Sequence, residues 1–225
     1  MPRIPKPSLK AVLFDLDGTL IDSIPYHRRS FASVFREIGL KVPKRGVAGI
    51  TRKATEEVYF ELQVKKRTAI EMEKFIDLKR KHYYAIIRGK RILFPEALPL
   101  LSALKRRKLK LCLVTNSSRL TANNSAPVLL RKKFDSIVTY DDVLHGKPSA
   151  EPYKLALKRM RLKPENCIVA GDSAMDVISA RRAGMKCVCV TGGASTVKQL
   201  RSSKPWKIVS GLDEIMSFLK SRFEF

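Results

Sequence analysis

Long apolar runs are absent from this 225-residue sequence, although 44% of its residues are hydrophobic. No segment approaches the ~18 consecutive apolar residues that a membrane-spanning helix needs. Residues 1–7 are basic and rich in proline, without the apolar stretch of a secretory signal. We therefore expect a globular, cytoplasmic protein that has no membrane partner.

Acidic residues are few: 21 Asp and Glu stand against 45 Lys and Arg, which gives a formal net charge of +24. A surface this basic attracts anions, whether phosphorylated metabolites, nucleic acid or anionic lipid. The basic clusters are scattered near predicted helix ends and lack interleaved aromatic residues. This pattern favours solvated helix faces over a nucleic-acid site, which stays open as an alternative. The clusters lie at residues 65–67, 79–81, 105–108, 131–133 and 181–182.

Cysteines are also few, and all four lie in apolar runs that are typical of strands. Cys187 and Cys189 have the spacing of half a metal site, but no histidine or second cysteine pair stands near them. We therefore expect buried free thiols in a reducing compartment.

Short apolar runs alternate with helical patterns over most of the chain. Alternation of this kind predicts an α/β fold, in which a doubly wound parallel sheet has all its strands' carboxyl ends at one edge. Strands are expected at 11–14, 109–114, 136–139, 167–170, 186–190 and 207–209. Helices are expected at 95–107, 119–130, 151–160, 174–183 and 211–223.

One long interval, from residue 17 to residue 115, interrupts this alternation. A single βαβ unit takes about 30 residues, so the interval holds additional structure. Helix-like apolar spacing recurs within it at 24–38, 51–64 and 68–87. We predict a helical domain of residues 23–91, inserted into an α/β core of residues 1–22 and 92–225. Placed over the sheet edge, it would act as a lid.

Chemically capable residues gather where the predicted strands end. Asp15 and Asp17 follow the first strand, and at about 4 Å with an effective dielectric of about 20 their charges repel by roughly 4 kcal/mol. A cation is therefore expected beside them. Further polar residues can reach the same edge, namely Thr115, Asn116, Lys147, Asp172 and Asp176. The set suits phosphoryl transfer, with a nucleophilic carboxylate, a hard divalent cation such as Mg²⁺ and a lysine that neutralises phosphate charge.

These residues lie in four motifs, and the chain resembles the haloacid dehalogenase-like hydrolase superfamily in all of them. The motifs are Asp-Leu-Asp-Gly-Thr-Leu-Ile-Asp-Ser at 15–23, Val-Thr-Asn-Ser at 114–117, Gly-Lys-Pro at 146–148 and Gly-Asp-Ser-Ala-Met-Asp at 171–176. The similarity is to the branch with a small helical cap, which includes phosphoglycolate phosphatases, sugar-phosphate phosphatases and β-phosphoglucomutases. It implies a Rossmann-like core and a Mg²⁺-dependent phosphatase that hydrolyses a small phosphorylated metabolite through an aspartyl phosphate.

The resemblance also implies a role for each motif residue. Asp15 would be the nucleophile and a metal ligand. Asp17 would serve as general acid and base and would ligate the metal through its carbonyl. Asp172 would bind Mg²⁺, and Asp176 would support it or be only an acid favoured by the helix dipole. Phosphate would be bound by Gly18, Thr115, the amide of Asn116 and Lys147. Thr115 is further expected to cap the helix that follows it.

Substrate recognition is expected to come from the inserted helices. In related sugar-phosphate enzymes a histidine and a basic residue face the active site at positions similar to His27 and Arg52. The alternative, that His27 is a partly exposed helix histidine and Arg52 is one surface arginine among many, is equally open. Mutases of this branch usually carry an acid before the metal-binding Asp172, whereas this chain has Gly171, as the phosphatases do. Hydrolysis is therefore favoured. A hexose-phosphate mutase and a passive nucleic-acid-associated protein are the alternatives. The expected assembly is a monomer or a small homo-oligomer.

Overall fold

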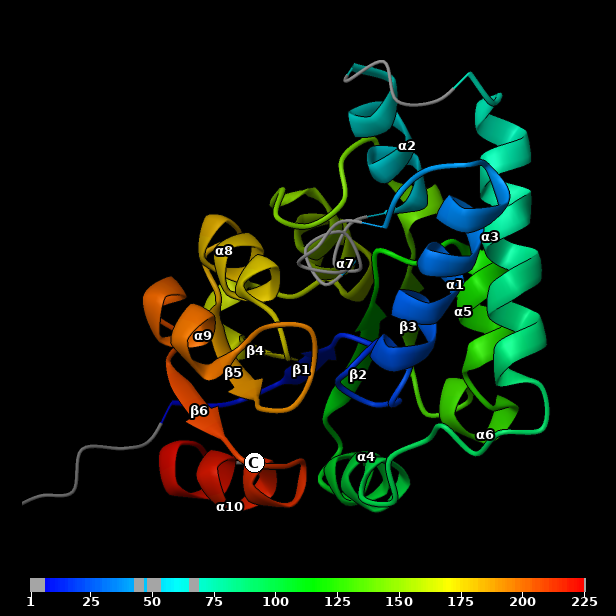
Figure 1. The fold of residues 1–225 in the computed structure, drawn as a ribbon. Helices are drawn as coiled ribbons and strands as arrows, with labels where there is room; N and C mark the ends of the chain where they lie inside the picture. The colour runs from blue at the N-terminus through cyan, green and yellow to red at the C-terminus, as the bar shows by residue number, and fades with distance from the viewer. Residues whose placement is uncertain (1–6, 43–46, 48–53, 65–68, 225) are drawn as a thin grey trace, which may run out of the picture.

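A six-stranded parallel sheet forms the centre of the protein in a computed structural model that describes residues 7–42, 47, 54–64 and 69–224 (Figure 1). The strand order is β3-β2-β1-β4-β5-β6. The strands are β1 (Ala11–Phe14), β2 (Lys110–Val114), β3 (Ser136–Val138), β4 (Cys167–Gly171), β5 (Lys186–Val190) and β6 (Lys207–Val209). The predicted doubly wound α/β fold is confirmed.

Strand β1 is buried on both faces, as its four consecutive apolar residues indicate. Val12 and Phe14 belong to one apolar cluster, and Ala11 and Leu13 to the cluster on the opposite face. The first cluster includes residues of α4 (Ala97–Arg106), α5 (Arg119–Ser125), α6 (Val128–Arg131) and α10 (Asp213–Arg222). The second includes residues of α7 (Glu151–Met160), α8 (Ala174–Arg182) and α9 (Val197–Ser203).

Two local features depart from the predicted helices. The expected helix at 119–130 is divided into α5 and α6, because Pro127 has no amide hydrogen to continue the first helix. Helix α9 was not predicted from its apolar pattern, since only seven residues form it. Its start was nevertheless encoded, because Thr196 and Gln199 form a reciprocal capping box.

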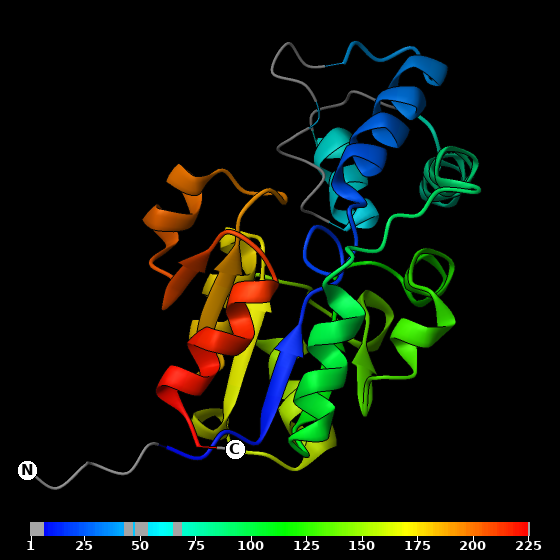
Figure 2. The same ribbon diagram turned by 90° about the horizontal axis from the view of Figure 1, so that it is seen from below.

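Three further helices lie beyond the carboxyl end of β1 and pack on one another rather than on the sheet (Figure 2). They are α1 (Ile24–Glu37), α2 (Thr55–Val64) and α3 (Met72–Ile87), here called the helical unit. Their apolar cluster contains Phe31, Phe35, Val58 and Phe75. The unit falls within the predicted insertion, and the domain boundaries at residues 22–23 and 91–92 stay a prediction.

The position of β1 determines where the site can lie. It pairs with β2 on one side and β4 on the other, so the chain order reverses direction at this strand. Ligands of open α/β sheets bind at such a switch point, beyond the strands' carboxyl ends. Asp15, Thr115 and Asp172 directly follow β1, β2 and β4, and therefore meet there.

Two expectations about residue classes can also be compared with the structure. No helix in the described ranges is both long enough and apolar enough to cross a membrane. All four cysteines are buried free thiols, as predicted.

Asp142 joins three segments beside the sheet, and its carboxylate is predicted to stabilise the fold in a pH-dependent way. It accepts hydrogen bonds from Arg119 (2.5 Å), Arg159 (2.8 Å) and the Thr139 hydroxyl (2.7 Å). Burial raises its pKa, but the bonds from Arg159 and Thr139 outweigh burial and lower the pKa to about 2. Because the folded-state pKa is depressed, this stabilisation is present above the unfolded value of about 4 and is lost as pH falls toward about 2. Denaturation of the parent and of Asp142→Asn between pH 2 and 7 should therefore converge in acid, whereas parallel curves would contradict the assignment.

Candidate active site

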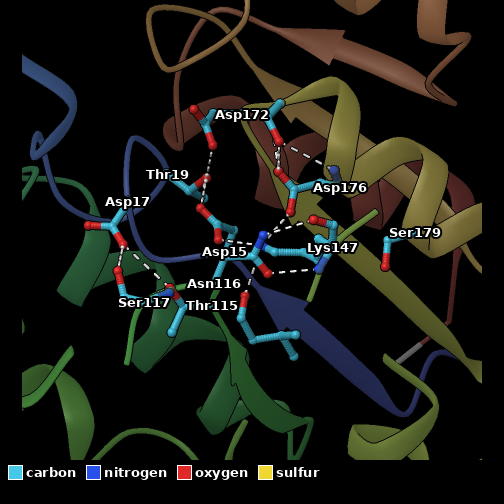
Figure 3. A network of polar contacts seen from close by, with 12 residues as sticks. Asp15, Asp17, Thr19, Thr115, Asn116, Ser117, Lys147, Asp172, Asp176 and Ser179 are labelled. Atoms are coloured by element: carbon cyan, nitrogen blue, oxygen red, sulfur yellow. Dashed lines mark hydrogen bonds and ion pairs between the residues drawn. The ribbon is translucent and has the colours of Figure 1, made fainter. Parts of the chain in front are cut away.

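Asp15 and Lys147 form a buried ion pair at the carboxyl end of β1 (Figure 3). The Lys147 ammonium lies 2.5 Å from Asp15 Oδ1 and 2.7 Å from Asp176 Oδ1, and it also donates to the Val114 carbonyl at 3.1 Å. These contacts use all three donors of the ammonium. Lys147 is 132 residues from Asp15 in the chain, so only the fold brings them together.

Asn116 holds the backbone of Lys147 in place. Its amide group donates to the Lys147 carbonyl at 2.9 Å and accepts from the Lys147 amide at 2.8 Å. A side chain at Gly146 would come within 2.7 Å of Asn116 Oδ1, so this close approach requires glycine. The predicted phosphate contact of the Asn116 main-chain amide stays a prediction, since these bonds concern its side chain.

Asp172 lies on the other side of Asp15 and is oriented by two donors. The Thr19 hydroxyl is 3.3 Å from Asp15 Oδ2 and 3.2 Å from Asp172 Oδ1, so it bridges the two carboxylates. The Ala194 amide donates to Asp172 Oδ2. A Cβ at Gly193 would collide with the Asp172 carboxylate, so the loop after β5 can approach this closely only with glycine there.

Asp176 lies in the first turn of α8 and has both carboxylate oxygens engaged. One oxygen accepts from Lys147 and from the Tyr153 hydroxyl at 3.1 Å, and the other accepts from the Ser173 hydroxyl at 2.6 Å. Ser173 and Asp176 form a capping box at the start of α8. Asp176 is thus an acid in the first turn of α8, its carboxylate additionally contacts Lys147, and its role toward a metal stays a prediction.

Negative charge exceeds positive charge in this cluster. Asp15, Asp172 and Asp176 are all buried, and a ligand atom of each lies within 4.8 Å of the others. Burial, followed by the charge of Asp176, raises the pKa of Asp172 to about 7. Burial and the neighbouring carboxylates also raise the pKa of Asp15. For Lys147, burial lowers the pKa, but the charges of Asp15 and Asp176 outweigh burial and raise it. Three carboxylates around one ammonium are the donor set that a hard divalent cation fits.

Asp17 faces away from this cluster, toward the helical unit (Figure 3). Ser23 donates to its Oδ1 at 2.6 Å, and the His27 ring lies 3.1 Å from the same atom. Ser117 donates to Oδ2 at 2.7 Å, and the Thr115 hydroxyl is 3.4 Å away. The carboxylate therefore has donors from α1 and from the segment that follows β2.

His27 connects Asp17 to Lys79. Its Nε2 faces Asp17, and its Nδ1 lies 2.9 Å from the Lys79 ammonium. A carboxylate only accepts and an ammonium only donates, so the proton of neutral His27 is on Nε2. Lys79 is only 6% exposed, so the expectation of a solvated helix face is wrong for this member of the basic cluster at 79–81, whereas Lys81 is exposed. Burial lowers the pKa of Lys79 to about 8, although the charge of Asp17 opposes this.

Asp17 is held in its ionised form by this arrangement. Burial raises its pKa, but the charge of His27 and hydrogen bonds from His27, Ser23 and Ser117 outweigh burial and lower it. The pKa of His27 is itself lowered by burial and then by Lys79.

These residues line a cavity of about 80 Å³ between the sheet edge and the helical unit. Its volume suits a compact group rather than a large ligand, since drug-sized ligand sites span roughly 300–1,000 Å³. Lining side chains from the helical unit include His27, Glu56, Lys79 and Arg80, and those from the sheet edge include Asp15.

Some predicted residues lie elsewhere or have other contacts. Arg52 lies outside the described residues. The Gly18 amide donates to Ile21 at 2.8 Å and Gly18 has φ of +87°, which favours a turn-forming role and leaves phosphate binding a prediction. Thr115 does not cap the next helix, because Ser118 is the N-cap of α5 and accepts from the Thr121 amide. His27 has both ring nitrogens engaged, so its contact with substrate stays a prediction.

Several residues of the site were not singled out from the sequence. Thr19 and Ser23 follow Asp15 in the first motif, and that proximity was a usable signal. Lys79, Tyr153 and Ala194 reach the site only through tertiary packing, and their local sequence gave no such signal.

A family model of haloacid dehalogenase-like hydrolases matches residues 9–184. The chain belongs to this family. It is therefore a hydrolase, and the predicted resemblance is confirmed.

Its relatives in this hydrolase family align over almost their whole length. Pyrophosphatase PpaX from Oceanobacillus iheyensis is 27% identical over 96% of this chain and 99% of that protein. Phosphoglycolate phosphatase from Aquifex aeolicus is 30% identical, over 91% and 97% respectively. A β-phosphoglucomutase from Clostridium difficile shares the fold, with a TM-score of 0.81 at 20% identity over 95% of this chain and 96% of that one.

The two hydrogen bonds between the Asn116 side chain and the Lys147 backbone, here called the Asn116 clamp, yield a prediction. Asn116→Ala removes two partly buried hydrogen bonds, each worth about 0.5–1.5 kcal/mol, and should lower both the free energy of unfolding and the hydrolase rate. Urea denaturation and a rate assay measure the two effects. Asn123→Ala, at an exposed position on α5, is the matched control and should change stability by less than about 0.5 kcal/mol. An unchanged rate in Asn116→Ala would show that Lys147 does not need the clamp.

Proposed function

We propose that this hydrolase is a Mg²⁺-dependent phosphatase that cleaves a small phosphorylated metabolite through an aspartyl phosphate on Asp15. The observation that carries the proposal is the Asp15 carboxylate, paired with Lys147 and lining a small polar cavity beside Asp172. An ionised carboxylate presented in this way is a nucleophile for phosphorus.

The reaction proceeds in two displacements. In the first, Asp15 attacks phosphorus, the bond to the leaving oxygen breaks, and Asp17 gives that oxygen a proton. In the second, water attacks the aspartyl phosphate, Asp17 takes a proton from the water, and phosphate leaves Asp15 free. One carboxyl group serves both steps, because the acid of the first step becomes the base of the second.

The environment of Asp17 fits both tasks. Its lowered pKa makes it a carboxylate in this arrangement, which is the form that takes a proton from water. A phosphate dianion placed beside it raises the pKa of a carboxyl group through like-charge repulsion, which favours the protonated form in the first step.

Thr115 and the amide of Asn116 are assigned as donors to the phosphoryl oxygens, and Lys147, whose three donors are engaged by protein groups, is assigned to neutralising their charge. Charge on these oxygens must be neutralised in the transition state, and fixed donors at the sheet edge do so without reorganisation. Asp176 accepts a hydrogen bond from the Lys147 ammonium, and the Tyr153 hydroxyl donates to the same Asp176 oxygen.

Mg²⁺ would be held by Asp15, Asp172 and the main-chain carbonyl of Asp17, with Asp176 supporting them. The excess of buried carboxylates and the raised pKa of Asp172 fit a divalent cation at this place. When bound, it supplies positive charge to the phosphate and relieves the repulsion between carboxylates.

Hydrolysis is favoured over a mutase reaction by Gly171. A Cβ at this position would lie 2.5 Å from Asp176 Cγ, so an acid there would displace Asp176 from Lys147. The names of the relatives, a pyrophosphatase and a phosphoglycolate phosphatase, and the small cavity agree with a compact phosphorylated substrate.

The nucleophile assignment predicts the behaviour of Asp15→Asn. Turnover of phosphorylated metabolites and of 4-nitrophenyl phosphate in Mg²⁺ should fall by about a thousandfold or more, because an amide cannot attack phosphorus. Chelation of Mg²⁺ should inactivate the parent. Asp22→Asn, at an exposed aspartate seven residues further on, is the matched control. Parental turnover by Asp15→Asn would falsify the assignment.

The two alternative functions have outcomes of their own. Glucose 6-phosphate formed from β-glucose 1-phosphate would indicate a mutase. Salt-sensitive nucleic-acid binding without turnover would indicate a passive protein.

The role of Asp17 predicts a dependence on the leaving group. A nitrophenolate leaves as a stable anion, whereas an alkoxide has to be protonated as it leaves. Asp17→Asn should therefore lower kcat/KM much more for an alkyl phosphate than for 4-nitrophenyl phosphate. Equal losses on both substrates would remove Asp17 from the first proton transfer. Steady-state kinetics on the two substrates decides between these outcomes.

A further inference from the structure

Tyr83 joins the helical unit to the α/β core through a buried hydrogen bond. Its side chain is 1% exposed, and its hydroxyl lies 3.0 Å from Ser125 Oγ on α5. The Ser125 hydroxyl donates to the Thr121 carbonyl at 2.8 Å. A serine hydroxyl has a single proton, so Tyr83 is the donor in the bond between the two side chains.

The ring of the same tyrosine supports the side chains behind Asp17. It is stacked on the His27 ring with 4.1 Å between centroids and 4° between planes. The Lys79 ammonium lies 4.9 Å from the centroid of the Tyr83 ring. Tyr83 therefore contacts His27 and Lys79, two of the three side chains in the series Lys79–His27–Asp17.

The stacking of Tyr83 on His27 and its hydrogen bond to Ser125 differ in geometric precision. Stacked rings attract over a range of offsets, so stacking alone lets the His27 ring slide. A hydrogen bond weakens steeply with distance and angle, so the bond to Ser125 fixes the far end of the tyrosine. The bond thereby fixes the position of His27 relative to α5, whose N-cap residue Ser118 directly follows Ser117.

We propose that Tyr83 is a positioning residue for the acid–base carboxylate: its hydroxyl, anchored on Ser125, fixes the ring that keeps His27 against Asp17. The inference rests on the proposed function, since it acts on the proton transfer assigned to Asp17. It assigns no contact between Tyr83 and the substrate.

The neighbouring Tyr84 supplies a matched control. Its hydroxyl accepts a hydrogen bond from Asn124 on α5 at 3.1 Å, so it also connects α3 to α5. That contact is exposed, and Tyr84 does not line the cavity. Tyr84→Phe thus removes a bond between the same two helices without altering the support of His27.

The test compares Tyr83→Phe, Ser125→Ala and Tyr84→Phe with the parent. The substrates are 4-nitrophenyl phosphate and the alkyl phosphate that the parent hydrolyses fastest in a metabolite screen. Tyr83→Phe and Ser125→Ala should each lower kcat/KM for the alkyl phosphate about fivefold, the effect of one hydrogen bond of about 1 kcal/mol. Both should leave kcat/KM for 4-nitrophenyl phosphate nearly unchanged, and Tyr84→Phe should leave both values unchanged.

A double-mutant cycle with His27→Ala tests whether Tyr83 acts through His27. In that background Tyr83→Phe should have no further effect, because the side chain that it positions is gone. Parental values in Tyr83→Phe, equal losses on both substrates, or a full additional loss in the His27→Ala background would each overturn the proposal. Thermal unfolding confirms that each variant is folded, and Ser125→Ala tests the same bond if Tyr83→Phe is not.

Failure of this inference is distinguishable from failure of the proposed function. If Asp15→Asn keeps its turnover, the proposed function fails and this inference with it. If Asp15→Asn is inactive and Asp17→Asn discriminates between the leaving groups, but Tyr83→Phe does not, only the positioning role fails.

Discussion

The contact between the Lys147 ammonium and the Asp15 carboxylate is the interaction on which the rest of the site depends. Both groups are buried, and a buried charge is tolerated only when it is paired and hydrogen-bonded. Asn116 fixes the backbone of Lys147, and Asp176 and Val114 engage its remaining donors. The ammonium nevertheless offsets only part of the carboxylate charge, which explains why a divalent cation fits beside it.

Around this pair the site has two parts with different origins. The nucleophile and the proposed metal ligands follow neighbouring strands of one rigid sheet, so their spacing is determined by strand register. Asp17 belongs to the same motif as Asp15, but its partners Ser23 and His27 come from the segment leading into the helical unit and from the unit itself. Lys79, which contacts His27, also comes from the helical unit. The protonation of Asp17 is thus governed by helices that the sheet does not position, and Tyr83 connects them to the core.

Much of the fold was predictable, because its signals are local. Four consecutive apolar residues before Asp15 predicted a buried strand, and glycine and proline marked the ends of most helices. The division of 119–130 at Pro127 could have been recognised from the same chemistry. Lys79 could not: on a helix, a charged run looks solvated until the partner surface is known, and its hydrogen-bond partner His27 is 52 residues away along the chain. Thr115 was misassigned as a cap, since Ser118 offers the same chemistry three residues later.

The strands, the four motifs and the residue types needed for phosphoryl transfer can be read from the amino-acid sequence, because each depends on residues close together in the chain. Which of these side chains touch follows from the folded arrangement: Lys147 pairs with Asp15, Thr19 bridges two carboxylates, and His27, itself in contact with Lys79, reaches Asp17. Distances between side chains far apart in sequence follow from strand order and helix packing. Burial, which sets their charge states, follows from the same packing and has no local signature.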